Sequence, residues 1–589
     1  MKNVTPSPEP SRLRHLLPLF AGQKQTFVLG FALLIITNAS AAAIPYVMKL
    51  ATEELMRQSV PHFYILTLIA LAVTNAFFRI QSRTRIFGIG RDVEFALRSR
   101  YHAKLLSLDA PFLDHEKTGE LASRAAADVS AVRMFVGPGF LQISNALMAY
   151  AATMPIMLAL DPLLTLLALA PIPLVLGVSR LLTRRMYRLS RVVADRFGAL
   201  SGFIQESIAG IAAIHAHARE SDWNRRFAAE TEELSRAALR HARLQSLFGP
   251  MVVLGGAIGG FIILAYGGRA VATGRLTMGD FVAFSGYLAM LIWPTVGFGW
   301  ILTVMQRGLA ALDRISGVLD AHPFLDPAVA AAPPGEKRWS GAIAIDHLSF
   351  AFQPGTPVLD DLSLTIPADS LTGLAGRIGS GKSALLQVLA RLYPAPEGTI
   401  RIDGRDLNTI PEAELRRELA MVPQESFLFS STLLQNLLLD RPDPSHFHAR
   451  EALRLAALEE EVQRFPQGLE TLIGERGITL SGGQRQRAAL ARALVGDPSV
   501  LLLDDVFSHV DARTEERILE NIRTASRHRT VVMVCHRVAA LQRADWIHLL
   551  DEGRIVASGT HDTLLETSPL YRDLHNTMSR AEALEALAR

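Results

Sequence analysis

Nine consecutive residues in the C-terminal half have the types and spacing needed to bind phosphate groups. Glycines in this stretch allow the backbone to turn tightly and to point N–H groups at phosphate oxygens. Its lysine supplies positive charge for β- and γ-phosphates, and the serine that follows can ligate Mg²⁺. An apolar segment precedes the stretch and a helix-forming segment follows it. The sequence therefore predicts a strand–loop–helix site for ATP and Mg²⁺, made by Gly376, Arg377, Ile378, Gly379, Ser380, Gly381, Lys382, Ser383 and Ala384.

Four further polar residues are candidates for work on the bound nucleotide. Asp504 and Asp505 follow the apolar run Val500–Leu503, which predicts a buried strand that delivers both carboxylates to the rim of the site. We expect Asp504 to hold Mg²⁺ and Asp505 to polarise the attacking water. Gln424 could carry its amide to metal and water, and His536 could reach the γ-phosphate. Each residue also has a structural alternative. Asp504 could cap a helix and Asp505 could be a spectator acid. Gln424 could lie in a surface turn, and His536 could be an ordinary structural histidine.

A second candidate anion site begins at Leu480. The sequence L-S-G-G-Q-R-Q-R opens a helical stretch, and a helix N-terminus with free N–H groups attracts anions. The residues that would present it are Ser481, Gly482, Gly483 and Gln484.

The N-terminal half has the composition of a membrane domain. The chain has 589 residues, 49% of them hydrophobic, and its mean hydropathy of +0.22 is high for a wholly soluble protein. Six apolar runs each have the roughly 20 residues that a membrane-spanning helix needs. Short and long connections alternate between them, and the long ones are basic and helix-permissive. With the basic N-terminus, this favours the cytoplasmic side for both termini. The runs are at about 26–50, 61–81, 139–160, 162–183, 248–270 and 281–306.

The composition along the chain predicts five segments. A basic segment at 1–25, with a short interfacial helix in Arg12–Phe20, precedes an all-α transmembrane domain at 26–312. A proline- and alanine-rich linker at 313–340 leads to an α/β nucleotide-binding domain at 341–578 and a tail at 579–589. The formal charge of +3 is small for this length and does not indicate a nucleic-acid-binding surface. The single cysteine excludes an intramolecular disulfide.

Taken together, these motifs resemble those of the ABC transporter ATPases, since Leu480–Gln484 matches the signature of that family. The resemblance covers nearly the whole chain and is to an exporter half-transporter, with six spans followed by one ATPase domain. It implies that Phe352 stacks on adenine and that Asp511, in Ser508–Asp511, lies in the loop joining two ATP sites. Three further segments resemble exporter regions that couple the two domains: His115–Val132, Gly210–Phe227 and Gly474–Gly477.

The resemblance also implies a dimer in which the signature of one chain closes the ATP site of the other. The family usually has glutamate where this chain has Asp505. The ordinary pKa values of the two acids are close, about 3.9 and about 4.3, so reach decides between them. One missing methylene withdraws the carboxylate by about 1 Å, which can cost ~10²-fold in rate. We therefore expect slow hydrolysis at this chain's own site and an intact signature for a partner's site.

This asymmetry predicts a heterodimer. The sequence, including Met290–Pro294 in the sixth span and the double aspartate after Leu503, most resembles bacterial multidrug resistance-like subunits of the Mdl type. The implied function is ATP-driven export of an amphipathic or hydrophobic small molecule, or a lipid, across the bacterial inner membrane. An ATP-gated regulator or channel with little turnover remains an alternative, as does a homodimeric exporter. Polar residues in the spans, among them Asn38, Asn75 and Asn145, could line a cargo cavity or join helices to one another.

Overall fold

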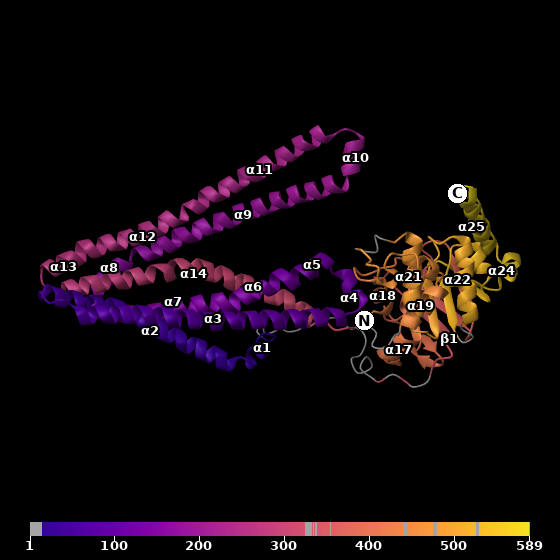
Figure 1. Cartoon of the computed structure of the whole chain (residues 1–589), viewed down its shortest axis with the longest axis horizontal. Coiled ribbons are helices and arrows are strands. Elements are labelled where there is room, and N and C mark those ends of the chain that lie inside the picture. Colours follow the sequence, from indigo (N-terminus) through magenta and orange to yellow (C-terminus); the bar gives the residue numbers. More distant parts are fainter. Residues whose placement is uncertain are drawn as a thin grey trace. The chain divides into compact units, whose positions relative to one another are not determined.

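The structure, a computed structural model, describes residues 14–323, 333, 335, 338–353, 355–439, 446–474, 480–525 and 529–587. The chain forms two compact units (Figure 1). The first contains the residues up to Leu106 together with Thr118–Ala321, and the second contains Ser107–Lys117 and the residues from His322 onward. The two units are therefore not simply consecutive in the sequence.

In its described part the first unit consists of helices. Six helical stretches are long and apolar enough to cross a membrane, and each predicted span falls on one of them, which confirms the six-span prediction. Short π-helical turns join some of the helices within these stretches. The helices are α1 (Leu17–Ala21), α2 (Lys24–Met56), α3 (His62–Ser107), α5 (Thr118–Ser123), α6 (Val129–Met134), α7 (Phe140–Leu160), α8 (Pro162–Leu169), α9 (Pro171–Ala209), α10 (Ile211–Ala216), α11 (Glu220–Ser246), α12 (Phe248–Ile262), α13 (Gly268–Ala272) and α14 (Met278–Leu319).

Polar caps start the helices that follow two short connections. The carboxylate of Asp161 accepts a hydrogen bond from the backbone N–H of Leu164 at 2.9 Å, where α8 begins after α7. Thr277 and Asp280 form a reciprocal capping box at the start of α14. Such side chains satisfy the first free N–H groups of a helix and so favour a helix start at that point.

Large apolar side chains of the first unit point outward. On α3, Phe63 is 74% exposed, Val73 is 64% exposed and Phe77 is 57% exposed. A water-soluble surface rarely presents contiguous apolar side chains of this size, whereas lipid chains or a second membrane subunit can cover them. The exposure therefore fits a membrane domain.

Two sheets organise the second unit. The larger has the order β10-β9-β3-β8-β7-β6, and its strands from β9 to β6 run parallel. The smaller is antiparallel, with the order β2-β1-β4-β5. This is the predicted α/β domain. The strands are β1 (Ile343–Phe350), β2 (Leu359–Ile366), β3 (Leu371–Gly376), β4 (Ile400–Ile402), β5 (Arg405–Asp406), β6 (Leu419–Val422), β7 (Val500–Asp504), β8 (Thr530–Val534), β9 (Trp546–Asp551) and β10 (Arg554–Gly559).

Helices cover the parallel sheet, so its central strands are buried. Every residue of β3, β7 and β8 is buried, which explains their continuous apolar runs. The helices of this unit are α4 (Ala110–His115), α16 (Lys382–Leu389), α17 (Glu412–Glu418), α18 (Leu433–Leu438), α19 (His446–Leu455), α20 (Glu459–Val462), α21 (Gly482–Leu494), α22 (Ala512–Ala525), α23 (Val538–Gln542), α24 (His561–Thr567) and α25 (Pro569–Leu587).

Two helices continue past the segment boundaries expected from the sequence. Helix α14 ends at Leu319, beyond residue 312, and α25 ends at Leu587, beyond residue 578. Helix α1 occupies part of the expected interfacial helix, whose first residue, Arg12, lies outside the described residues.

A tyrosine of the second unit contacts α4. The hydroxyl of Tyr393 donates a hydrogen bond to the carboxylate of Asp114, immediately before the segment His115–Val132 that resembles a coupling region. Burial, and then this carboxylate, raise the pKa of Tyr393 to about 12, so the phenol stays protonated and remains a donor.

A buried carboxylate joins the start of the second unit to its core. The carboxylate of Glu414, which is 1% exposed, accepts hydrogen bonds from the indole of Trp339 at 2.9 Å and from the backbone N–H of Gly335 at 3.0 Å. It also pairs with the guanidinium of Arg405. The arginine, followed by the other two donors, lowers the pKa of Glu414 to about 2.

Replacing this acid should destabilise the second unit in a pH-dependent way. We expect Glu414→Gln to cost up to about 3 kcal/mol at neutral pH, since one pKa unit corresponds to about 1.4 kcal/mol. Because the pKa is lower in the folded protein, the stabilisation is complete above about pH 4.5 and is lost as the pH falls towards 2. Thermal unfolding of the full-length protein across this range is the measurement. The exposed Glu397→Gln is the control, and equal losses in the two variants would contradict the prediction.

Candidate nucleotide site and signature helix

The strand order brings the predicted site residues together at one edge of the sheet. Strand β3 lies beside β8, and β8 lies beside β7, all three parallel. Their carboxyl ends therefore meet at the same edge, where ligands bind in open parallel sheets. The phosphate loop follows β3, Asp504 ends β7, and His536 comes two residues after β8. Sequence residues more than a hundred positions apart thus form one site.

Glycine is required at two positions of the loop. A Cβ atom on Gly376 would lie 2.2 Å from the carbonyl oxygen of Leu550, and one on Gly381 would lie 2.9 Å from that of Val358. Gly381 also has a φ of +102°, which other residues rarely adopt, where the loop enters α16. Helix α16 begins at Lys382, directly after the loop, and the first N–H groups of a helix are available to bind phosphate oxygens.

Lys382 lies inside this loop. It is 5% exposed, and its ammonium donates hydrogen bonds to the carbonyl oxygens of Gly376 at 2.9 Å and Arg377 at 2.7 Å. The hydroxyl of Ser380 is 3.3 Å away. Burial lowers the pKa of Lys382, whereas the charges of the two aspartates raise it. An ammonium in this position can exchange its carbonyl partners for phosphate oxygens with little movement.

Ser383 and Asp504 supply oxygen atoms suited to a magnesium ion. The serine hydroxyl donates a hydrogen bond to Asp504 Oδ1 at 2.9 Å. Asp504 is 3% exposed, and its burial raises its pKa. A nearby divalent cation would offset the cost of ionising this buried carboxylate, and Mg²⁺ prefers hard oxygen ligands of this kind. The residues present therefore fit Mg²⁺.

Asp505, Gln424 and His536 also meet at this edge. Gln424 donates its side-chain amide to Asp505 Oδ2 at 3.4 Å, and the imidazole of His536 interacts electrostatically with both aspartates. Burial raises the pKa of Asp505 and lowers that of His536, which favours a neutral imidazole. Asp505 has a φ of +47°, a conformation that aspartate tolerates better than most residues. The arrangement can orient a water molecule beside a phosphate.

The signature residues form the capped start of a long helix. The Ser481 hydroxyl accepts a hydrogen bond from the Gln484 N–H at 3.2 Å, and the Gln484 side chain accepts one from the Ser481 N–H at 2.9 Å. Helix α21 therefore begins at Gly482, and its first N–H groups precede those that bonds within the helix can satisfy. Gln484 is anchored in turn, because its amide donates to Glu461 at 2.7 Å.

Gln486 was not predicted from the sequence, yet it joins the signature helix to the segment after Asp505. It is 4% exposed, donates a hydrogen bond to Ser508 Oγ at 2.8 Å and accepts one from the backbone N–H of His509 at 3.1 Å. Gly483 packs on the same segment, where a Cβ would lie 2.5 Å from the His509 carbonyl oxygen. A polar residue two positions after the signature was the available signal.

Two remaining candidates occupy less specific surroundings. Phe352 is 43% exposed and lies edge-on to Tyr393, with ring centroids 5.0 Å apart, so part of its ring can receive a ligand. Asp511 caps α22 by accepting a hydrogen bond from the Thr514 N–H at 3.0 Å. Hydrogen bonding with Thr514, through its side chain first and then its backbone, lowers the pKa of Asp511. Most of the segment Gly474–Gly477 lies outside the described residues.

Within the first unit, the three asparagines singled out in the spans form hydrogen bonds between helices. Asn38 of α2 donates a hydrogen bond to Asn145 of α7 at 3.0 Å, and Asn75 of α3 donates one to the Thr37 carbonyl at 2.7 Å. These contacts favour the helix-joining role for the three asparagines over a cavity lining.

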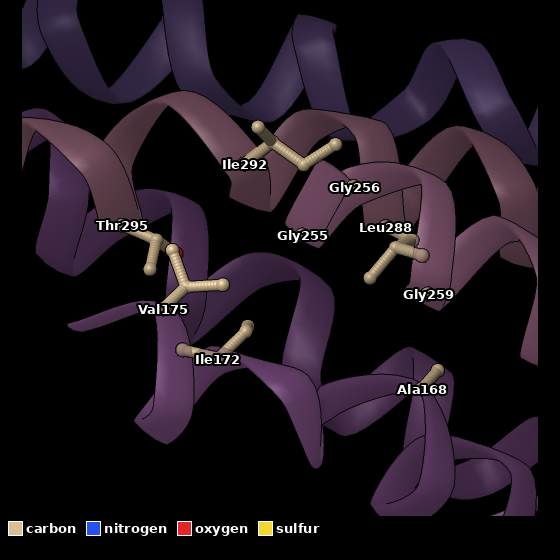
Figure 2. Close-up of a pocket in the computed structure, with 9 residues that line it drawn as sticks. All are labelled: Ala168, Ile172, Val175, Gly255, Gly256, Gly259, Leu288, Ile292 and Thr295. Atoms are coloured by element: carbon tan, nitrogen blue, oxygen red, sulfur yellow. The ribbon is translucent and has the colours of Figure 1, made fainter. Parts of the chain in front are cut away.

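A small pocket between α8, α9, α12 and α14 is almost entirely apolar (Figure 2). Its volume of about 30 Å³ has room for about one water molecule. Transported molecules need several hundred cubic ångströms, so this pocket is not a cargo site.

Comparisons with known proteins support a membrane domain in the first unit and an ATP-binding domain in the second. A family model described as the ABC transporter transmembrane region matches residues 27–295, and one described as ABC transporter matches residues 359–508. The probable multidrug resistance ABC transporter ATP-binding/permease protein YheI of Bacillus subtilis (strain 168) is 34% identical over 516 residues, which cover 87% of this chain and 86% of YheI.

Two further proteins match over almost the whole chain. The multidrug resistance-like ATP-binding protein MdlA of Escherichia coli (strain K12) is 31% identical over 577 residues, 96% of each chain. A bacterial Atm1-family ABC exporter solved with ATP bound superposes with a TM-score of 0.79 at 25% identity, over 94% of this chain and 99% of that one. The chain belongs to the ABC transporter family, and its six spans followed by one ATP-binding domain make it a half-transporter of the exporter type.

Proposed function

We propose that this chain is one half of a heterodimeric exporter that uses ATP to move an amphipathic or hydrophobic small molecule, or a lipid, across the bacterial inner membrane. The observation that carries the proposal is one chain holding a complete phosphate site around Lys382, a capped signature helix at Ser481, and an aspartate at position 505. The multidrug names of the two relatives support export of such cargo.

The proposed roles follow the site geometry. Residues Gly376–Ala384 hold the phosphates through backbone N–H groups and the Lys382 ammonium, while Phe352 stacks on adenine. Ser383, Asp504 and Gln424 would hold Mg²⁺, which when bound would offset the negative charge of the phosphates. Asp505 orients water and His536 reaches the γ-phosphate. Ser481–Gln484 close the ATP site of the partner chain, and Asp511 lies in the loop that joins the two sites.

The heterodimer proposal depends on the reach of residue 505. Asp505 has a short side chain in a conformation that holds its backbone close to Val534, whose carbonyl oxygen accepts a hydrogen bond from the Asp505 N–H at 3.1 Å. Its carboxylate therefore cannot extend as far as that of a glutamate at this position. A slow site here and an intact signature helix suit a partner that supplies the faster site, as in subunits of the Mdl type.

Substitutions at residue 505 test this asymmetry. Asp505→Asn should leave most of the ATPase activity of the assembled complex in place, because the carboxylate it removes is already about 1 Å too short. Asp505→Glu should raise turnover at this site by restoring reach. Steady-state ATPase activity of the purified complex in lipid is the measurement. If Asp505→Asn silences the complex, Asp505 is a working base and a homodimer with two equivalent sites becomes the better assembly.

Cargo-dependent ATPase activity separates an exporter from an ATP-gated channel. An exporter should hydrolyse ATP faster when an amphipathic compound is added, because cargo binding and hydrolysis are coupled. A channel or regulator should instead show ATP-dependent ion conductance in a planar bilayer without stimulated turnover.

We further propose that both termini and the domain at 341–578 lie in the cytoplasm. The support is an even number of candidate spans and the basic stretches that follow the second and fourth spans. With Cys535 replaced by alanine, a cysteine at Ser59 should react with an impermeant maleimide in intact cells. A cysteine at Ser190 should react only after permeabilisation. Reversed labelling would overturn this topology.

A further inference from the structure

A basic pocket lies between α9 and α11, which run side by side in the first unit (Figure 1). Its volume is about 500 Å³, and leucines form its apolar wall. Two arginines three residues apart on each helix point to the same pocket, a spacing that places them on one helix face. The four are Arg185 and Arg188 of α9 and Arg240 and Arg243 of α11.

These four charges have no counter-ion among the residues that the structure describes. None of their guanidinium groups has a hydrogen bond or ion pair there. The nearest acids of α11 are already paired, Glu233 with Arg196 and Glu232 with Arg236. Between Arg180 and Arg191 the sequence has five arginines and no acid. Like charges so close together repel one another, so a bound anion would stabilise the pocket.

The position of the pocket along the helices corresponds to the membrane surface. The apolar run of α9 ends at about residue 183, directly before the basic residues, and α12 begins at Phe248, five residues after Arg243. At 1.5 Å per residue, Arg240 and Arg243 lie about 7–12 Å from the start of the next apolar helix. The headgroup layer is about 5–8 Å thick on each side of the hydrocarbon core, so long arginine side chains at these positions can reach the lipid headgroups.

Apolar surface continues from the pocket towards the membrane. Leu181 of α9 is 51% exposed, and Leu254 and Val253 of α12 are 60% and 70% exposed. Leu189 and Leu244 line the pocket itself. A ligand that combines a phosphate with hydrocarbon chains can therefore satisfy the arginines and cover the leucines together. Free phosphate could do only the first.

We propose that this pocket binds the phosphate group of an anionic membrane lipid in the leaflet on the side of the long basic connections. Guanidinium groups form forked, charge-assisted hydrogen bonds to phosphate oxygens, and basic pockets between membrane helices suit lipid headgroups. The site is separate from the ATP site and does not depend on which cargo is exported.

Native mass spectrometry of the full-length complex in non-ionic detergent tests this site. Phosphatidylglycerol is the probe, phosphatidylcholine is the zwitterionic comparison, and inorganic phosphate is the competitor. We expect saturable binding of phosphatidylglycerol that is about 30-fold weaker in Arg185→Gln/Arg188→Gln, because two arginine contacts are lost. Arg240→Gln/Arg243→Gln should show a similar loss and serves if the first variant does not assemble. Millimolar inorganic phosphate should displace little lipid.

The matched control is Arg184→Gln/Arg191→Gln. It removes the same charge from the same helix, within about one helical turn of the same depth, but neither residue lines the pocket. Its affinity for phosphatidylglycerol should change by less than about threefold. An equal loss in this control would mean that general positive charge, not the pocket, binds lipid, and would overturn the proposal. Equal binding of phosphatidylcholine would overturn it too, as would full displacement by inorganic phosphate, which would assign the site to a soluble anion.

Discussion

Lys382→Ala should abolish ATP binding at this chain's own site. Its ammonium is buried in the loop and holds two carbonyl oxygens at 2.7 and 2.9 Å, the position from which it would meet phosphate oxygens. Each charge-assisted hydrogen bond to phosphate contributes about 1.5 kcal/mol or more, so losing two should weaken binding at least about 100-fold. Photo-crosslinking of an azido-ATP analogue to this chain measures the effect directly.

The control for this variant is Arg401→Ala, which removes a positive charge from the same domain. Arg401 is half exposed, and its nearest acid, Asp346, is 3.9 Å away, so its loss should leave crosslinking unchanged. Undiminished labelling of Lys382→Ala would show that the nucleotide phosphates bind elsewhere. Burial already lowers the pKa of Lys382. As the pH is raised, nucleotide binding should therefore weaken at a lower pH than it would if this lysine had its ordinary pKa.

Gly483→Ala should remove most of the ATPase activity of the assembled complex. The added Cβ would lie 2.5 Å from the His509 carbonyl oxygen, so the signature helix must move by about 1 Å. A displacement of that size can cost about 100-fold in rate at a site that the helix completes. Under the proposed asymmetry the loss falls on the partner's faster site, and is therefore larger than that of Asp505→Asn. Steady-state ATPase activity in lipid is again the measurement.

Two comparisons separate this effect from general misfolding. Gly559→Ala adds a Cβ in the same domain that would meet Thr563 at an ordinary 3.5 Å, so its activity should stay near that of the wild type. Nucleotide crosslinking at Lys382 should also survive in Gly483→Ala, because the residues that a Cβ would meet there, His509 and Val510, are not part of the phosphate loop. Full activity of Gly483→Ala would show that the helix start does not complete any ATP site.

Features that depend on neighbouring residues could be predicted from the sequence. The loop at Gly376–Ser383 is specified by glycine and lysine spacing, because the turn and its charge are made within a few residues. The six spans are specified by length and composition alone, since the thickness of the hydrocarbon layer sets both. Asp504 and His536 could be placed after buried strands because parallel strands buried on both faces read as continuous apolar runs.

Features that depend on contacts between distant residues appeared only in the tertiary structure. The sequence left the role of the asparagines open, and the bond from Asn38 to Asn145 exists because α2 and α7 pack together. From the sequence, Gln486 is one polar residue within a helix. Its hydrogen bond with the backbone N–H of His509 is seen only in the folded chain. Likewise, four arginines in two charged segments become one pocket only when α9 and α11 lie side by side. A one-dimensional pattern records which face a residue occupies, whereas only packing decides what that face meets.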